Sequence, residues 1–235
     1  MGNIFEHEFG GSLHLNSNVN KIVIENGSRK ISGIEVVHEG NVSPTKYEFD
    51  EYVCNADIPY IIRNMIPNSE EIFKTWKPST FDKKKFSCSG FNMYLALDKI
   101  YDNVQTHVIS FSKDIRKSYD RIESGDFNDD ITLYVRNSCV VDKSVSPPGK
   151  SGLFVMVFVP NLKDGKIDWT DQDVVEKTKQ LAFDVLEQRC GFKDLRNHIE
   201  ESKIVTPLTW RSSKQIEFGS VFSMSNTLFQ SLSFR

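Results

Sequence analysis

The chain has 235 residues, of which 39% are hydrophobic and 26% are charged, and its formal net charge is -3. This composition is that of an ordinary globular protein, and the length suits one large domain or two small ones. The 29 basic and 32 acidic residues do not form the basic footprint of a nucleic-acid-binding protein, so we expect no nucleic-acid partner.

The sequence contains no metal-binding or redox motif. Its cysteines are widely spaced and form no C-x-x-C pair, so we expect reduced, mostly buried thiols. They are Cys54, Cys88, Cys139 and Cys190. The segment "HEFGG" starting at His7 begins like the zinc-binding pattern H-E-x-x-H, but Gly11 stands where the second histidine must be. We therefore expect no metal.

The start of the chain, "MGNIFEHEFGG", lacks the layout of a secretory signal, which favours a cytoplasmic location. The longest apolar run, "LFVMVFV" from Leu153 to Val159, is too short to span a membrane and is typical of a buried strand. A lysine-rich segment, "KPSTFDKKKF", has two interpretations: an ordinary solvated surface, or a peripheral contact with anionic lipid.

The first quarter of the chain predicts a small β meander. Two strands within residues 12–40 meet at "ENGS", where Asn26 and Gly27 are expected to supply the positive φ angles of a tight hairpin turn. A third strand, "TKYEF", follows. The segment "EYVCNAD" is expected to form a strand from Tyr52 to Ala56, and Asp57 is expected to cap a helix with a proline in its first turn.

The remaining sequence predicts strands interleaved with two helices. Strands are expected over "FNMYLAL", "THVISF", "ITLYVRN" and "GLFVMVFVP" because apolar residues alternate or run continuously there. Ser112 is expected to cap a helix that ends at Gly125, and Thr170 with Asp173 is expected to open a helix over residues 174–190. The pattern favours an α/β protein of α+β character that contains two sheets.

Two features that resemble catalytic groups have ordinary explanations. The tripeptide "GKS" at Gly149 resembles the end of a phosphate-binding loop, but Ser144 stands where that motif requires its first glycine. His107 lies in a predicted strand with no nucleophile or carboxylate close to it in the sequence, so a structural histidine is favoured over a catalytic base. The residues alone therefore leave the ligand unidentified.

A set of segments in a fixed order resembles the phytoene desaturase family, the FAD-dependent carotenoid and dehydrosqualene desaturases, in its bacterial form. The segments are "FGGSLHLNSNVNKI", "VCNADIPY", "KKFSCSGFNMYLALD", "THVISFSKDI", "LYVRNSCVVDKSVSPPGKSGLFVMVFVP", "IDWT", "TPLTW" and "GSVFSMSNTLFQSLSFR". The most specific are D-x-S-x-x-P-x-G from Asp142 to Gly149 and Q-S-x-x-F-R from Gln230 to Arg235, since no strand or helix periodicity requires them.

The resemblance implies an FAD-dependent oxidoreductase that removes hydrogen from a long polyisoprenoid of the phytoene or dehydrosqualene type. It implies that residues 1–57 are part of an FAD-binding domain and that residues 58–235 form a substrate-binding domain with a mainly antiparallel sheet, ending with the start of the return to the FAD domain. Cofactor contacts are expected at Val19, Asn55 and Ala56, and catalytic residues are not assigned. A substrate tunnel is expected to be lined by Phe91, Met93, Leu95, Phe154, Met156 and Phe158.

The resemblance also predicts that the chain is an internal fragment. Members of the family hold the FAD pyrophosphate with a G-x-G-x-x-G turn and close over the flavin with a glycine-rich segment, and neither pattern occurs here. We therefore expect weak or no FAD binding by this chain alone, and a complementary chain could carry the missing motif. Two alternatives stay open: a carotenoid isomerase or oxygenase of the same superfamily, and a non-catalytic isoprenoid-binding fragment.

Overall fold

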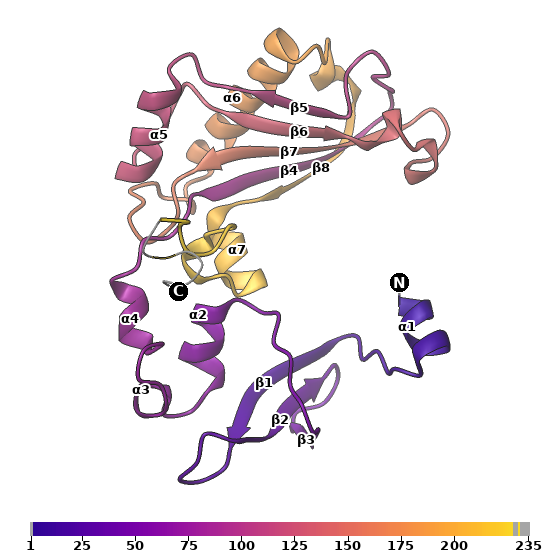
Figure 1. Cartoon of the computed structure of the whole chain (residues 1–235). Helices are drawn as coiled ribbons and strands as arrows, with labels where there is room; N and C mark the ends of the chain where they lie inside the picture. Colours follow the sequence, from indigo (N-terminus) through magenta and orange to yellow (C-terminus); the bar gives the residue numbers. More distant parts are fainter. Residues whose placement is uncertain (1, 228–229, 231–235) are drawn as a thin grey trace. The chain divides into compact units, whose positions relative to one another are not determined.

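The computed structural model describes residues 2–227 and residue 230, and it divides into two compact units between Lys83 and Lys84 (Figure 1). Mixed helices and antiparallel sheets confirm the predicted fold class. The expected motif from Gln230 to Arg235 lies, apart from Gln230, outside the described residues.

The first unit is built on a three-stranded antiparallel sheet in the order β1-β2-β3. The helix α1 (Gly2–Phe9) precedes β1 (Ser17–Ile24), β2 (Ile31–His38) and β3 (Thr45–Tyr47). The predicted hairpin is confirmed, but its turn differs: Gly27 has a φ of 73° and Asn26 does not have a positive φ. The connection between β1 and β2 is longer than a two-residue turn, so a single residue in the left-handed region reverses the chain.

Short helices complete the first unit. They are α2 (Ile58–Tyr60), the π-helical turn η1 (Ile61–Met65), α3 (Ser69–Ile72) and α4 (Pro78–Asp82). The predicted helix after Asp57 is confirmed, and its Ile61 and Met65 pack with Ile22 of β1 in a small core. The predicted strand from Tyr52 to Ala56 is wrong, because this segment is irregular and pairs with no described strand; a strand exists only through a hydrogen-bonded neighbour.

The division between the units falls later than the expected functional boundary. Residues 58–83 belong to the first unit, through the contact of η1 with β1. The assignment of residues 1–57 to an FAD-binding domain and of residues 58–235 to a substrate-binding domain stays a prediction.

The second unit contains a five-stranded antiparallel sheet in the order β5-β6-β7-β4-β8. Its strands are β4 (Ser89–Leu97), β5 (His107–Ser110), β6 (Leu133–Asn137), β7 (Ser151–Val159) and β8 (Ile199–Val205). The two central strands, β4 and β7, are paired over nine residues each. The predicted antiparallel sheet of the substrate-binding part is present.

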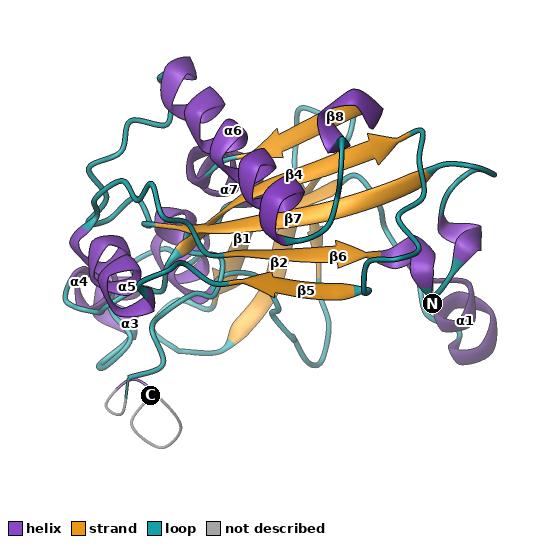
Figure 2. Ribbon diagram, turned by 90° about the horizontal axis from the view of Figure 1, so that it is seen from above, coloured by secondary structure: helices purple, strands orange, loops and turns teal. Residues whose placement is uncertain are grey.

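One long helix, α6 (Gln172–Arg189), lies across one face of this sheet (Figure 2). Its Ala182, Phe183 and Leu186 are buried in the same core as the alternate apolar residues of β4, β6 and β7. The shorter α5 (Ile115–Ser124) lies at one end of the sheet, and α7 (Pro207–Lys214) lies on the side opposite α6 (Figure 1). Short 3-10 turns are η2 (Ser138–Val140), η3 (Lys143–Val145), η4 (Leu195–His198) and η5 (Glu217–Gly219).

The caps of the two main helices differ from those predicted. The N-cap of α5 is Asp114, whose carboxylate accepts from the Lys117 N–H, and Ser112 lies too early in the chain to reach the helix. The N-cap of α6 is Asp171, which accepts from the Asp173 N–H, while Thr170 donates to Asp168. In both cases a nearby aspartate is a strong N-cap acceptor and helps neutralise the positive helix start.

A buried amide joins β6 to the loop that connects β4 to β5. Asn137 is fully buried, and its Nδ2 donates to the carbonyl oxygens of Tyr101 at 2.8 Å and Val104 at 3.3 Å. These bonds satisfy two backbone acceptors that water does not reach. They hold the loop against the end of β6.

We expect Asn137→Ala to lower the free energy of unfolding by about 1 to 3 kcal/mol, because it leaves buried carbonyls without their donor. Asn103→Ala, at an exposed position of the same loop, should change the free energy of unfolding by less than about 0.5 kcal/mol. Urea unfolding followed by circular dichroism measures both. Equal stability of the two variants would contradict this assignment.

Candidate functional site: the open face of the five-stranded sheet

Side-chain alternation gives the five-stranded sheet one covered face and one open face. On β4, Phe91, Met93 and Leu95 are at most 3% exposed and pack in the α6 core. Residues between them point the other way, since successive side chains of a strand alternate in direction. Tyr94, for example, is 42% exposed. The side opposite α6 is called the open face here.

The six residues predicted to line a tunnel fall on opposite faces. Phe91, Met93 and Leu95 of β4 lie in the covered core. Their partners on β7, Val157, Val155 and Leu153, lie in the same core. Phe154, Met156 and Phe158 are partly exposed and lie on the open face. One tunnel cannot include both trios, because the backbone of the sheet separates them. The tunnel role stays a prediction for the second trio, whereas the first trio has the geometry of ordinary core.

The register of the strands arranges the open face in rows that cross the sheet. The middle row consists of Ile109, Tyr134, Met156, Asn92 and Val205. The row beside it consists of His107, Arg136, Phe154, Tyr94 and Lys203. The rings of Tyr94 and Phe154 lie 5.3 Å apart, and those of Tyr134 and Phe154 lie 6.2 Å apart. These are contact distances for aromatic pairs, so the rings of Tyr134, Phe154 and Tyr94 form one aromatic cluster across β6, β7 and β4.

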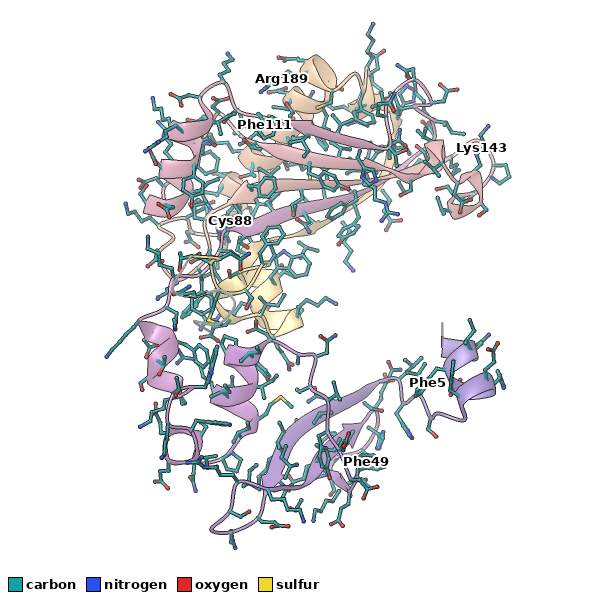
Figure 3. The ribbon with its side chains drawn as sticks, in the orientation of Figure 1. Phe5, Phe49, Cys88, Phe111, Lys143 and Arg189 are labelled. Carbon is teal, nitrogen blue, oxygen red and sulfur yellow. The ribbon has the colours of Figure 1, made fainter. Side chains whose placement is uncertain are left out.

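A cavity of about 630 Å³ lies at the α5 end of the open face. Its lining includes Phe158 from β7, Phe111, and Ile115 and Tyr119 from α5. Cys88 also lines it, and burial raises the pKa of its thiol, so this sulfur is a neutral thiol near pH 7 rather than a nucleophilic thiolate. Figure 3 labels Cys88 and Phe111 at this end of the sheet. Most of the exposed lining is apolar, and it also includes the charged residues Lys85, Glu123 and Asp164.

A second cavity, of about 860 Å³, lies at the other end of the same face. Tyr94, Phe154 and Arg136 line it from the sheet, and Ser146 and Pro147 line it from the loop that follows β6. That loop contains η2 and η3 and carries Lys143, which is labelled in Figure 3. The D-x-S-x-x-P-x-G motif therefore forms a wall of this cavity, at its polar end.

The helix α7 and the segment after it border the open face. Trp210 of α7 donates from Nε1 to the carbonyl oxygen of Gly90 at 3.0 Å. Phe222 stacks on Phe158, with ring centroids 6.4 Å apart. Gly219 has a φ of 61°, and a Cβ there would lie 2.3 Å from the Pro207 carbonyl oxygen, so the close return of this segment to α7 requires glycine.

Asn92 is an unusual polar group in the middle row. It is 4% exposed, and its Oδ1 has no hydrogen-bond partner among the residues that the structure describes. It lies between Met156 of β7 and Val205 of β8. A buried acceptor without a donor costs free energy, which makes Asn92 the position on this face where a donor group of a ligand or a water would be stabilising.

The residues predicted to contact FAD lie in two separate segments of the first unit. Val19 lies in β1 just before a bulge, where the register skips Asn20 and leaves that residue outside the ladder. Asn55 and Ala56 are exposed in the irregular segment before α2. A cofactor role for these three residues stays a prediction. The described part of the chain contains no cluster of metal-ligating side chains.

Sequence reasoning missed Arg136, Tyr134 and Asn92 as residues of the site. Each has a clear position in a predicted strand, but only the pairing of β6, β7 and β4 shows that they share one face. Of the four cysteines, which were expected to be mostly buried, Cys139 and Cys190 are buried, Cys88 is half-buried and Cys54 is exposed. Within residues 2–227 and residue 230, no helix is both long and apolar enough to cross a bilayer.

No family model matches the chain. It is 35% identical over 229 residues to a 4,4'-diapophytoene desaturase (4,4'-diapolycopene-forming) from a Methylomonas species, covering 97% of this chain and 42% of the relative. It is 33% identical to a 4,4'-diaponeurosporene-forming 4,4'-diapophytoene desaturase from Staphylococcus haemolyticus, covering 97% of this chain and 44% of the relative. A crystal structure of an oxidoreductase from Methanosarcina mazei aligns with a TM-score of 0.46 and 16% identity, over 80% of this chain and 36% of that one.

The chain thus spans less than half the length of the curated relatives it matches. The match nevertheless covers almost every residue of the chain, and it is the match that the ordered sequence segments predicted. The resemblance is confirmed: nearly the whole chain is homologous to a part of the 4,4'-diapophytoene desaturases, in the phytoene desaturase family.

Proposed function

We propose that the chain supplies the substrate-binding sheet of an FAD-dependent oxidoreductase that desaturates a long polyisoprenoid in carotenoid biosynthesis. The observation that carries the proposal is the open face, where Phe154, Met156 and Phe158 connect an apolar cavity at one end to a second cavity at the other. The names of the relatives supply the substrate class: they are desaturases of a diapophytoene.

The physical properties of the open face suit a hydrocarbon. A polyisoprenoid offers no hydrogen-bonding group, so its affinity must come from buried apolar area, at about 25 cal/mol per Å². A strand of the length of β7 spans about 30 Å, which gives an extended chain a long line of contact. Desaturation with a flavin requires the protein to hold the substrate in place and exclude water more than it requires an acid and a base.

FAD, when bound, would supply the electron acceptor for this reaction. In this chain the expected contacts are Val19 beside the β1 bulge and the exposed Asn55 and Ala56. The sequence has no G-x-G-x-x-G turn, and that turn, at a helix N-terminus, is where dinucleotide cofactors gain most of their phosphate contacts. The contacts in this chain are too few to hold the cofactor tightly.

We therefore expect the purified chain to bind FAD weakly or not at all. After mixing with excess FAD and gel filtration, the protein fractions should show no flavin absorbance near 450 nm. Free riboflavin in the same experiment shows whether the column separates the flavin. A yellow protein with one FAD per chain would overturn this expectation and would place a complete cofactor site within these residues.

A longer protein that contains this stretch provides the direct test of the function. In the Methylomonas relative, the 229 matched residues can be replaced by this chain, and the chimera expressed with a source of diapophytoene. We expect a desaturated, coloured product with a red-shifted absorbance spectrum, because the chain supplies an equivalent substrate-binding face. A chimera carrying Met156→Asp should accumulate less product.

The chimera also separates the proposal from its alternatives. An unchanged number of double bonds with altered geometry would identify an isomerase, and an oxygenated product would identify an oxygenase. A folded chimera that binds FAD and makes no new product would favour a non-catalytic isoprenoid-binding role. Mass spectrometry of the extracted pigments distinguishes the three outcomes.

The open face itself can be tested with the chain alone. We expect the chain to bind retinyl acetate, an uncharged isoprenoid polyene, with quenching of tryptophan fluorescence, since Trp210 borders the face. Met156→Asp and Ile109→Asp place a carboxylate in the middle row and should raise the Kd about tenfold or more. Val42→Asp adds the same charge at an exposed loop of the first unit and should leave the Kd unchanged. Ile109 is 55% exposed, so its variant tests the face even if Met156→Asp unfolds.

Peripheral contact with a membrane and association with a complementary chain are further parts of the proposal. Ile115 and Tyr119 are exposed at the apolar cavity, at 58% and 59%, and Lys85 lies beside them through its ion pair with Glu123 of α5. Exposed apolar groups beside lysines are typical of surfaces that contact anionic lipid. A hydrocarbon substrate dissolved in lipid would enter the cavity most directly from such a contact.

A further inference from the structure

We propose that the open face distinguishes the two ends of its ligand and that Arg136 binds an oxygenated, anionic end group of an isoprenoid chain. The inference rests on the proposed function. It adds a class of ligand, isoprenoid chains with an anionic end group, that differs from a pure hydrocarbon. It predicts that the site takes isoprenoid acids, with the carboxylate at Arg136 and the hydrocarbon tail directed toward α5.

The two ends of the open face differ in the charged groups that they present. At the α5 end, Phe86, Phe111 and the apolar side of α5 line the cavity around Phe158, and its charged residues are the paired Lys85 and Glu123 and the acidic Asp164. The middle row is apolar or aromatic except for Asn92. In the next row, the aromatic pair Tyr94 and Phe154 has cations on both sides. A ligand with two identical apolar ends has no use for this difference, whereas an amphiphilic chain matches it.

Arg136 is the cation best placed to meet an anion on this face. It is exposed, and its side chain has no hydrogen bond or ion pair with any residue that the structure describes. Its register neighbours are His107 of β5 and Phe154 of β7. A guanidinium group presents paired donors that match the two oxygens of a carboxylate, so the group beside Phe154 is suited to a carboxylate at the end of an apolar chain.

The other charges of the same cavity are largely compensated. Lys150 forms an ion pair with Glu200, with the nearest nitrogen and oxygen 2.6 Å apart. Asp142 accepts from the N–H and the Oγ of Ser144, at 2.9 and 2.6 Å.

Lys203 shares the β8 side of the cavity with an acidic residue. It has Glu201 two residues away on the same side of β8. These opposite charges reduce the field on the β8 side. Two strands, β7 and β4, separate Arg136 of β6 from β8 in the sheet order, so the uncompensated positive charge lies at the β6 and β7 side of the row.

The geometry also gives the tail of such a ligand enough surface. Phe154, Met156 and Phe158 follow one another on the open face of β7. They extend from the Arg136 row to the apolar cavity over about 13 Å at 3.3 Å per residue. A carboxylate held at Arg136 would therefore leave its first isoprene units on this line of side chains and its far end in the α5 cavity.

The test uses the purified chain and two matched probes, all-trans-retinoic acid and its methyl ester. We expect the acid to bind more tightly than the ester, and Arg136→Gln to weaken acid binding by roughly three- to tenfold while leaving ester binding unchanged. Lys113→Gln removes the same charge next to α5, at the apolar end of the face, and should change neither affinity. Tryptophan quenching gives the dissociation constants, and thermal unfolding confirms that both variants are folded.

The possible results separate this inference from the proposed function. In one result, the chain binds the ester and the Arg136→Gln variant binds the acid as tightly as the unchanged chain does. That result would overturn the inference and would leave the proposed isoprenoid binding intact. An equal loss of acid binding in Arg136→Gln and Lys113→Gln would show a general charge effect and would also overturn it. Failure of the chain to bind either probe would overturn both the inference and the proposed open-face site.

Discussion

The antiparallel pairing of β4 with β7 is the interaction on which the second unit depends. Its register runs without a break from Ser89 opposite Val159 to Leu97 opposite Ser151. Because a strand alternates its side chains, a shift by one residue would move every side chain of one face to the opposite face. This single register therefore decides both which residues form the core under α6 and which residues lie on the open face.

The covered face stabilises the sheet so that the open face is free for another use. Leu133, Val135, Val155 and Val157 are fully buried beneath α6, and burial of such side chains contributes about 1.5 to 3 kcal/mol each. Asn137 adds polar connections from the same layer to the loop before β5. The open face is not required to complete this core, and its partly exposed aromatic side chains can contact a ligand without loss of the fold.

The site contains few of the features by which enzymes are commonly recognised. The Cys88 thiol is neutral, and the described residues hold no metal cluster. A flavin-dependent reaction on a hydrocarbon needs none of these, because the cofactor carries the chemistry and the protein supplies position and a dry surface. Under the proposed function, the polar groups at one end, with Arg136 among them, are the feature that would distinguish related substrates.

The local patterns of the sequence predicted most of the elements for direct physical reasons. Alternating apolar residues located β4, a continuous apolar run located β7, and helical spacing with terminal glycines located α5 and α6. The β8 strand was not predicted, because it is an edge strand whose "IEESKIV" is mostly exposed and lacks a clear alternation. The strand expected from Tyr52 to Ala56 has the right composition, but composition does not supply a pairing partner.

By itself, the sequence determined the family, the antiparallel character of the second unit, and the presence of apolar strands suited to an apolar ligand. Only the tertiary structure decided which side of those strands α6 covers and which side stays open (Figure 2). Phe91 and Phe154 look equivalent in the sequence, yet α6 covers the first and the second remains on the open face. The physical reason is that strand order and register are long-range properties: His107, Arg136, Phe154, Tyr94 and Lys203 form one row only after four separate strand pairings.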